Sequence, residues 1–427
     1  MLMAELMMIS HAVIAAFLAR MSAPEPILAA YSISFVVHAT LGSPVWACQI
    51  VFLSFIRDQA AVRRLAVFGF QTVASIAWLW LLLSLTPFGD VFFMDLFGVS
   101  QSVATEAKIC LLIGLLIPPT SVLRSIAYAM LMTERRTIWV TLGTVIRLVG
   151  LAGLLAVLSN WFEGAVVGVF ALAGCITIET VVAVAIAYPA YKRLPKSSSP
   201  VPSYRELWRF SWPIMMMQTA ESGVALTASF FLGRLLRPEL ALAAFGVMDS
   251  IVRVLLSPLR NLIHTTQTLV KSRADARVVM IFAAQIGIIF ATFTIALFYI
   301  PSVRALILQD VMGLPPHMAE YISPALQICF VLALCMTAAG LLRGMLIASK
   351  NTGAIAVSSL LRILAVLVVG ASAAALGADN GAMVGMLCLT LAFGCEAMYL
   401  TWRLIRIDRI GPALFSKRTS TSTSKRT

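Results

Sequence analysis

Charged side chains are scarce in this sequence, and their scarcity defines the class of the protein. Only 12% of the 427 residues are Asp, Glu, Lys or Arg, whereas 60% are hydrophobic and the mean hydropathy is +0.94. A soluble chain averages about 25% charged residues. Several apolar runs exceed the roughly 18–20 residues that cross a bilayer. The composition therefore predicts an all-α polytopic membrane protein and excludes a water-soluble enzyme.

Sequence motifs of catalysis and metal binding are also absent. The seven cysteines form no CxxC pair and the four histidines are scattered, so neither a disulfide framework nor a metal site is indicated. No Walker A sequence, HExxH, GxSxG or dinucleotide fingerprint occurs. We expect no enzymatic activity and no cofactor. Any work that the protein performs must then draw on an ion gradient, of H⁺ or Na⁺, or on the gradient of its own substrate.

The long apolar runs divide the chain into twelve expected spans, which give two bundles of six. They are 1–21, 27–56, 65–87, 102–131, 136–158, 163–191, 206–234, 240–269, 277–301, 318–348, 351–377 and 380–404. Most of the 32 lysines and arginines lie in the segments after the even-numbered spans and in the C-terminal tail. By the positive-inside rule this bias predicts an integral protein of the plasma (inner) membrane with both termini in the cytoplasm. The net charge of +13 thus indicates topology and contact with anionic membrane lipids, and no nucleic-acid partner.

The two halves of the chain repeat each other. AAYSISFVVHATLGSP (29–44) and AAFGVMDSIVRVLLSP (243–258) begin and end alike at an offset of 214 positions (243 minus 29). FLAR (17–20) and FLGR (231–234) share this offset, while MDLFGVS and QDVMGLP, and GTVIRL and SSLLRI, are 215 apart (309 minus 94, 358 minus 143). An even number of spans per copy gives both copies the same orientation. This pattern is typical of transporters built from two parallel halves.

The repeat sets the expected domain boundaries. We predict an N-terminal six-helix lobe (1–191), a cytoplasmic linker (192–205), a C-terminal six-helix lobe (206–408) and a disordered cytoplasmic tail (409–427). Span 1 is shorter than its counterpart, span 7, so we also expect the recorded start to clip the first helix. A monomer is expected.

Asp249 and Arg253 distinguish one copy of the repeated segment from the other. They lie four residues apart, acid first, on one helix face, where Phe35 and Ala39 stand in the first copy. A charge inside a membrane costs roughly 2.5–3.5 kcal/mol on insertion scales. The pair either neutralises itself between packed helices or lines a central cavity. Because the first copy folds without charge here, we favour a substrate-binding role, with Asp249 also able to couple an ion.

Arg147 and Arg362 occur in both copies, roughly three turns into their spans and about 16 Å deep. Two such arginines either clamp an anionic substrate or cap backbone carbonyls of neighbouring helices. Arg124 and Arg343 lie nearer the cytoplasmic ends of their spans. We expect these two to extend their guanidinium groups toward the membrane surface.

Other polar groups in the spans allow a functional or a structural interpretation. Glu5 and Glu221 are candidate proton or sodium sites, or else carboxyl groups that hydrogen-bond a neighbouring Ser or Thr. His38 is a candidate substrate-binding residue or a packing residue. Glu179 and Glu396, in spans 6 and 12, are expected to be structural.

Several segments make this chain resemble a known superfamily. They are DLFGVSQSVATEA (95–107), RFSWPIMM (209–216), LLSPLRN (255–261), SSLLRILAVLVV (358–369) and GCEAM (394–398). With the paired six-span halves, they resemble the multidrug and toxin extrusion transporters and the polysaccharide and lipid flippases. The second-half segments are most similar to the progressive ankylosis family. The resemblance implies export by alternating access of two rocking bundles.

Three functions remain open on this reading. The resemblance and the six arginines inside spans favour export of organic or phosphate-bearing anions. Glu5, Glu221 and Asp249, together with 20 methionines, favour a proton- or sodium-coupled multidrug exporter. A lipid-linked sugar flippase would need a larger and more basic cavity. All three predict a small-molecule or lipid-linked substrate and antiport or gradient-driven transport.

Overall fold

The computed structural model describes residues 2–134, 136–196, 201–270, 272–348 and 353–410, and in these residues every regular element is a helix. The elements of the first half (residues 2–196) are α1 (Leu2–Leu18), α2 (Pro24–Phe55), α3 (Gln59–Leu85), α4 (Pro87–Val91), η1 (Phe92–Leu96), α5 (Gln101–Gly114), α6 (Ile117–Thr133), α7 (Thr137–Leu158) and α8 (Ala165–Arg193). The elements of the second half (residues 201–410) are α9 (Tyr204–Leu232), α10 (Pro238–Arg260), α11 (Leu262–Leu269), α12 (Arg273–Tyr299), α13 (Pro301–Ala305), η2 (Leu306–Val311), α14 (Pro316–Gln327), α15 (Cys329–Ala348), α16 (Gly353–Ala375) and α17 (Gly381–Ile410).

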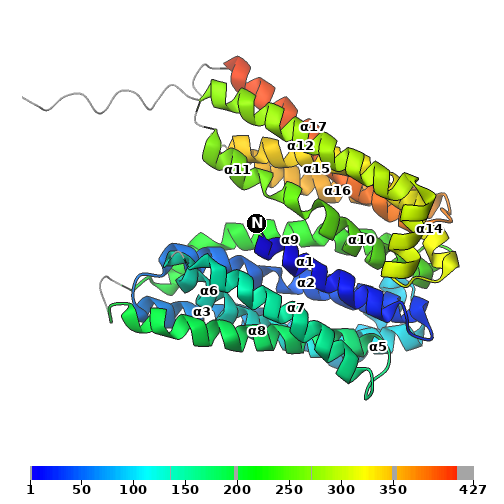
Figure 1. Cartoon of the computed structure of the whole chain (residues 1–427), viewed down its shortest axis with the longest axis horizontal. Helices are drawn as coiled ribbons and strands as arrows, with labels where there is room; N and C mark the ends of the chain where they lie inside the picture. Colours follow the sequence, from blue (N-terminus) through cyan, green and yellow to red (C-terminus); the bar gives the residue numbers. More distant parts are fainter. Residues whose placement is uncertain (1, 135, 197–200, 271, 349–352, 411–427) are drawn as a thin grey trace, which may run out of the picture.

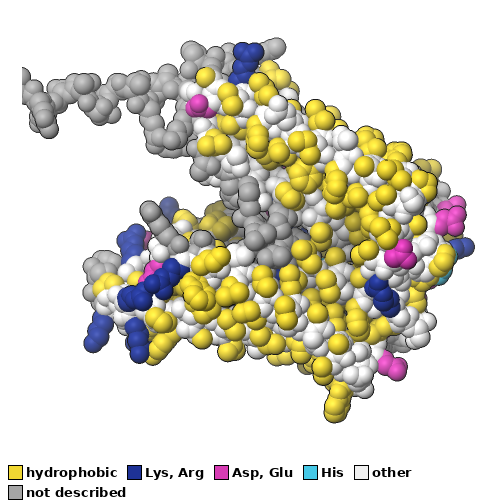
Figure 2. Space-filling model, in the orientation of Figure 1, with side chains coloured by type: hydrophobic (Ala, Val, Ile, Leu, Met, Phe, Trp, Pro, Cys, Tyr) yellow, Lys and Arg dark blue, Asp and Glu magenta, His cyan; other side chains and the backbone are white. Residues whose placement is uncertain are grey.

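The two halves lie side by side as two groups of helices (Figure 1). Helices α1 and α2 of the first half pack against α9 and α10 of the second, and one buried apolar cluster continues through both halves. The halves meet at the end that carries α5 and α14, which we call the closed end. They diverge toward the opposite, open end, where the surface is deeply indented (Figure 2). The line between the halves is therefore sealed at one end only.

Ten of the described helices or helix pairs are long and apolar enough to cross a membrane, which makes the chain an integral membrane protein. Helices α1 and α9, at the predicted spans 1 and 7, are not among the ten, so the count of twelve stays a prediction. Three predicted spans are each two helices: 102–131 contains α5 and α6, 240–269 contains α10 and α11, and 318–348 contains α14 and α15. A proline lies beside each break (Pro118, Pro258 and Pro324), where it removes an amide donor from the helix.

Local details repeat along with the helices. A five-residue helix that begins at Pro87 or Pro301 runs directly into a short π-helix, η1 or η2. A glycine with positive φ follows each π-helix, Gly98 at 64° and Gly313 at 70°. Only glycine takes up this backbone conformation without strain. The sequence repeat thus corresponds to a structural repeat down to single turns.

The repeated Ser-Pro pairs have a structural explanation. Proline cannot donate to the carbonyl four residues earlier. At Pro44 the preceding Ser43 hydroxyl donates to that carbonyl, of Thr40, at 2.7 Å, and before Pro258 the Ser257 hydroxyl donates to the carbonyl of Val254 at 3.2 Å. The serine replaces part of the hydrogen bonding that the proline removes. Helix α2 nevertheless stays continuous past its proline, whereas α10 ends at Arg260.

Candidate functional site

A cavity of about 350 Å³ lies between the two halves. Its walls come from α1, α2, α6, α7 and α8 in the first half and from α9, α10, α15, α16 and α17 in the second. These are equivalent positions in the repeat, so the two halves contribute equivalent helices. Of the sequence-predicted site residues, the cavity brings together Asp249, Arg253, Arg147, Arg362, His38 and Glu221. A volume of this size suits a small molecule.

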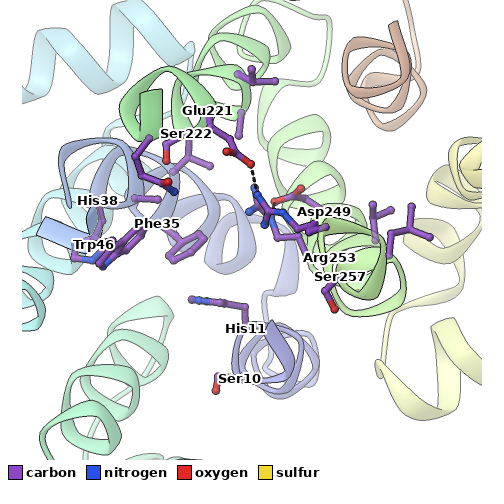
Figure 3. Close-up of a pocket in the computed structure, with 18 of the residues that line it drawn as sticks. Ser10, His11, Phe35, His38, Trp46, Glu221, Ser222, Asp249, Arg253 and Ser257 are labelled. Atoms are coloured by element: carbon purple, nitrogen blue, oxygen red, sulfur yellow. Dashed lines mark hydrogen bonds and ion pairs between the residues drawn. The ribbon is translucent and has the colours of Figure 1, made fainter. Parts of the chain in front are cut away.

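Asp249 and Arg253 form an ion pair on the cavity face of α10 (Figure 3). Arg253 Nε donates to Asp249 Oδ2 at 2.5 Å, and the arginine side chain keeps 33% of its surface exposed against 12% for the aspartate. The i, i+4 spacing on one helix face brings the two groups together without help from another element. The pair is thus a neutral unit whose guanidinium is the part open to a ligand.

The predicted ion-coupling carboxylates have different outcomes. Glu221 of α9 accepts a hydrogen bond from Arg260 of α10 and forms a second neutral pair at the cavity wall (Figure 3). Sequence reasoning missed this pairing, because Glu221 and Arg260 lie on different helices, 39 residues apart. The side chain of Glu5 lies outside the described residues. Among the side chains that are described, no three of His, Cys, Asp or Glu converge as a metal site would require.

A buried glutamate holds two arginines in the first half. Glu179 of α8 has no exposed surface, and its Oε2 is 2.6 Å from Arg124 Nη1 and 3.7 Å from Arg147 Nη1. Its other oxygen, Oε1, accepts a hydrogen bond from the Tyr128 hydroxyl at 2.7 Å. We call Arg124, Glu179 and Arg147 the first triad. The prediction that Arg124 extends to the membrane surface is wrong, because a carboxylate inside the bundle offers it a closer partner.

The second half contains an equivalent cluster. Glu396 of α17 is fully buried and binds Arg343, whose Nε is 2.6 Å from Oε1, while Arg362 Nε lies 3.5 Å from Oε2. The Ser358 hydroxyl also donates to Oε1, at 2.9 Å. We call Arg343, Glu396 and Arg362 the second triad. Arg343, like Arg124, was predicted to reach the membrane surface and instead binds a buried glutamate.

The cavity therefore has more positive than negative groups among the described residues. Five arginines line it, and only two carboxylates do: Arg124, Arg147, Arg253, Arg260 and Arg362 against Glu221 and Asp249. Arg147 and Arg362 are both buried, so their charge acts in a region of low dielectric constant, where it is poorly screened.

The histidines of the cavity lie on the first-half wall. His38, a predicted substrate-binding residue, is buried against the rings of Trp46 and Trp80, with ring centroids 6.3 and 5.6 Å away. His11 of α1 points into the cavity beside Phe35 and shares a 3.2 Å hydrogen bond with the Tyr31 hydroxyl (Figure 3). Sequence reasoning missed His11, although it lies on the same span as Glu5. The packing of His38 between two tryptophan rings fits a structural role. His11 is the histidine that points into the cavity.

The closed end is held by reciprocal arginine contacts. Arg20, after α1, donates to the carbonyls of Asp310 and Val311 in the second half, both at 2.8 Å. Arg234, its counterpart in the repeat, donates to the carbonyl of Leu96 in the first half at 3.0 Å. Each arginine thus binds the last turn of the other half's π-helix. The negative end of a helix dipole favours such a cation.

Two glutamates, one in each half, also bind groups of the opposite half. Glu25 at the start of α2 binds His317 at the start of α14, with Oε1 and Nε2 2.5 Å apart. Glu239 at the start of α10 accepts a 3.0 Å hydrogen bond from the amide of Ser100, which precedes α5. Carboxylates are favourable at helix N-termini. Glu239 therefore satisfies a backbone amide at a helix start of the other half, whereas Glu25 binds a side chain at the equivalent place.

Backbone also meets backbone at the closed end. A Cβ added to Gly98 would lie 1.9 Å from the carbonyl oxygen of Gly233, and one added to Gly233 would lie 2.0 Å from that of Phe97. No side chain fits between these two segments. We refer to this contact and the Arg20, Glu25, Arg234 and Glu239 contacts together as the seal.

Solved transporters share this arrangement of helices. An inward-facing multidrug resistance MATE family transporter of the MOP superfamily matches with a TM-score of 0.75 at 14% identity, over 94% of this chain and 95% of that one. The lipid II flippase MurJ, in an inward closed conformation, matches with 0.66 at 13% identity, over 93% and 85%. A eukaryotic MATE transporter, AtDTX14, matches with 0.62 at 13% identity, over 95% and 93%. No family model and no curated protein matches the sequence.

These likenesses establish the fold. The chain is an all-helical membrane protein with the fold shared by MATE transporters and MurJ in the MOP superfamily. Two of these three structures are transporters and the third is a flippase. At this level of identity the likeness shows the arrangement of helices only. The substrate has to be inferred from the cavity of this chain.

Proposed function

We propose that this protein is a secondary transporter that exports small organic or phosphate-bearing anions by alternating access. The observation that carries the proposal is the set of arginines at the cavity: five line its walls, against two carboxylates that do so, while the buried Glu179 and Glu396 contact arginines from behind the wall. A buried excess of guanidinium groups attracts anions and repels cations. The planar guanidinium also matches carboxylate and phosphate oxygens in two-point hydrogen bonding.

The seal supports an alternating-access mechanism. The halves are joined at the closed end by short polar contacts and diverge at the open end (Figure 1). A rocking motion of two halves about a central cavity needs contacts that can be exchanged from one end to the other. Lysine and arginine side chains gather at the open end of the first half (Figure 2), which favours assigning that end to the cytoplasm. The proposal thus places both termini in the cytoplasm of a plasma or inner membrane.

Two alternative functions find less support in the cavity. A multidrug exporter for cations would place its substrate against an excess of positive charge. A flippase for lipid-linked sugars would need more room than about 350 Å³. The finer resemblance to the progressive ankylosis family stays a prediction, since it depends on short sequence segments. Coupling to H⁺ or Na⁺ through Glu5, Glu221 or Asp249 stays a prediction as well.

Purified protein in liposomes tests the proposal. We expect exchange of labelled succinate across the membrane, above the rate in empty liposomes, and no exchange of labelled tetraethylammonium. Imposed proton and sodium gradients would identify the coupling ion. Cation exchange without anion exchange would instead favour the multidrug exporter, and translocation of a fluorescent lipid-linked sugar would favour the flippase.

A further inference from the structure

The cavity has two faces that differ in chemistry at equivalent positions of the repeat. On α2 the side chains of Phe35 and Trp46 line the cavity, and on α10 those of Asp249 and Arg260 do so. The offset of the repeat, 214 positions, joins Phe35 with Asp249 (249 minus 35) and Trp46 with Arg260 (260 minus 46). Each of these aromatic residues of α2 therefore has a charged counterpart on α10.

The aromatic face consists of Phe35 and Trp46 of α2 with His11 of α1. Phe35 and Trp46 are about three helical turns apart, so they lie on one side of α2. All three side chains are only partly buried, and all three line the cavity. The rings of Phe35 and His11 pack together with their centroids 4.1 Å apart (Figure 3). A ligand that enters between the two halves meets these ring surfaces.

The ionic face consists of Asp249, Arg253 and Arg260, which share one side of α10. Figure 3 shows Asp249 and Arg253 on the side of the cavity opposite Phe35 and Trp46. Arg253 binds Asp249 and still keeps 33% of its side chain exposed. Its guanidinium is therefore the part of this pair that an anionic group can reach.

From these two faces we infer that the substrate is an aromatic anion, with its ring against Phe35 and His11 and its carboxylate or phosphate at Arg253. The inference rests on the proposed function and narrows it to anions that carry a planar ring. Aromatic rings gain from stacked or edge-to-face contact with one another beyond the burial of their area. An aliphatic anion would bind the guanidinium and leave the rings without such a partner, whereas a neutral aromatic molecule would do the reverse.

Three small molecules separate the contribution of the ring from that of the charge. Benzoate has both, cyclohexanecarboxylate has the same charge on a saturated ring of similar size, and benzyl alcohol has the aromatic ring alone. Binding of each to the purified protein is measured by calorimetry. We expect benzoate to bind about fivefold more tightly than cyclohexanecarboxylate, as ring contact provides, and more tightly than benzyl alcohol. Phenyl phosphate should show the same preference over cyclohexyl phosphate.

Variants of Phe35 give the sharper test. Phe35→Leu keeps an apolar side chain and removes the ring, so it should reduce the preference for benzoate over cyclohexanecarboxylate to about twofold or less. Phe35→Met serves the same purpose if the leucine variant is unstable, and Phe35→Tyr keeps the ring and should keep the preference. Phe293→Leu, on the exposed face of α12 and outside the cavity, is the matched control and should leave the preference unchanged. The double variant Asp249→Asn with Arg253→Gln should instead weaken both carboxylates alike, because the ring contact remains.

The outcomes separate this inference from the proposed function. Equal binding of benzoate and cyclohexanecarboxylate, or an undiminished preference in the Phe35→Leu and Phe35→Met variants, would overturn the aromatic inference alone. Exchange of succinate without binding of benzoate would do the same. Binding of benzyl alcohol as tight as that of benzoate would overturn both the inference and the proposed function, because no role would remain for the anionic group. If neither carboxylate binds and succinate is not exchanged, both are wrong as well.

Discussion

Glu179 in α8 and Glu396 in α17 occupy equivalent positions in the two halves, and each is fully buried between two arginines of its own half. An isolated buried charge is among the most expensive groups that a membrane protein can hold. Because the cluster is duplicated, the free-energy cost of burying charge is offset by ion pairing in both halves. In each cluster the arginine farther from the glutamate, Arg147 or Arg362, also lines the cavity.

Removing either glutamate should destabilise the protein strongly. Glu179→Gln removes the carboxylate that Arg124 and Arg147 share, and loss of one partner from a buried ion pair costs about 3–5 kcal/mol. We expect a large fall in the thermal unfolding temperature in detergent. Adding Arg124→Gln restores the original net charge and should recover at least half of the loss. Glu163→Gln, on an exposed loop, is the control, and a double variant no more stable than the single one would contradict the triad.

The pair on α10 should separate structural from functional roles. If Asp249 and Arg253 only neutralise each other, Asp249→Asn with Arg253→Gln keeps both folding and transport, because no lone charge remains. If they bind substrate, the double variant folds and fails to transport. We expect the second result, with Arg253→Gln weakening anion binding and Asp249→Asn altering ion coupling. The measurement is transport per monodisperse, folded molecule, and normal transport by the double variant would reduce the pair to a structural role.

Topology can be tested by thiol labelling. The charge bias predicts that Lys196 lies in the cytoplasm and Asn160 outside. Both residues are exposed. In a cysteine-free background, Asn160→Cys should react with an impermeant maleimide in intact cells and Lys196→Cys only after permeabilisation. The reverse pattern would invert the assignment of the open end to the cytoplasm.

The seal makes a prediction at Gly98. Valine there would collide with the backbone of Gly233 and force the closed end apart. Ser222, which lines the cavity, serves as a reporter when replaced by cysteine. Gly98→Val should raise its labelling by an impermeant reagent added from outside at least severalfold. Gly377→Val is the matched control, because Gly377 has a similar φ of 62° and nothing within 4 Å of its Cβ position. Equal labelling in both variants would mean that backbone strain, and not opening of the seal, causes the increase in labelling.

Local features of the site could be predicted from the sequence. The ion pair of Asp249 and Arg253 follows from a spacing of four residues on one helix, which needs no knowledge of tertiary structure. The repeat likewise indicated equivalent helices in both halves, since short matching segments keep their order. The count of twelve spans was less secure, because α1 and α9 are less apolar or shorter than the others.

Contacts between distant helices could not be predicted in the same way. The first triad joins α6, α7 and α8, and nothing in the spacing of Arg124, Arg147 and Glu179 shows which faces of these helices meet. A clue did exist: each half has an arginine in its fourth and fifth spans and a glutamate in its sixth. The seal was hidden for another reason. Its partners lie in opposite halves, and most of its side chains bind backbone carbonyls or amides, which any sequence supplies.

The exchange of partners in the seal has the form of an isologous interface, in which residue i of one unit binds residue j of the other and the reverse also holds. Two identical six-span chains could make the arginine contacts of the seal as a symmetric dimer, since Arg20 and Arg234 are copies of each other and both bind backbone carbonyls. Asp249 and Arg253 break that symmetry, because no dimer of identical chains can carry an ion pair on one side only. Fusion of the two halves into one polypeptide is what permits a cavity with two unlike walls.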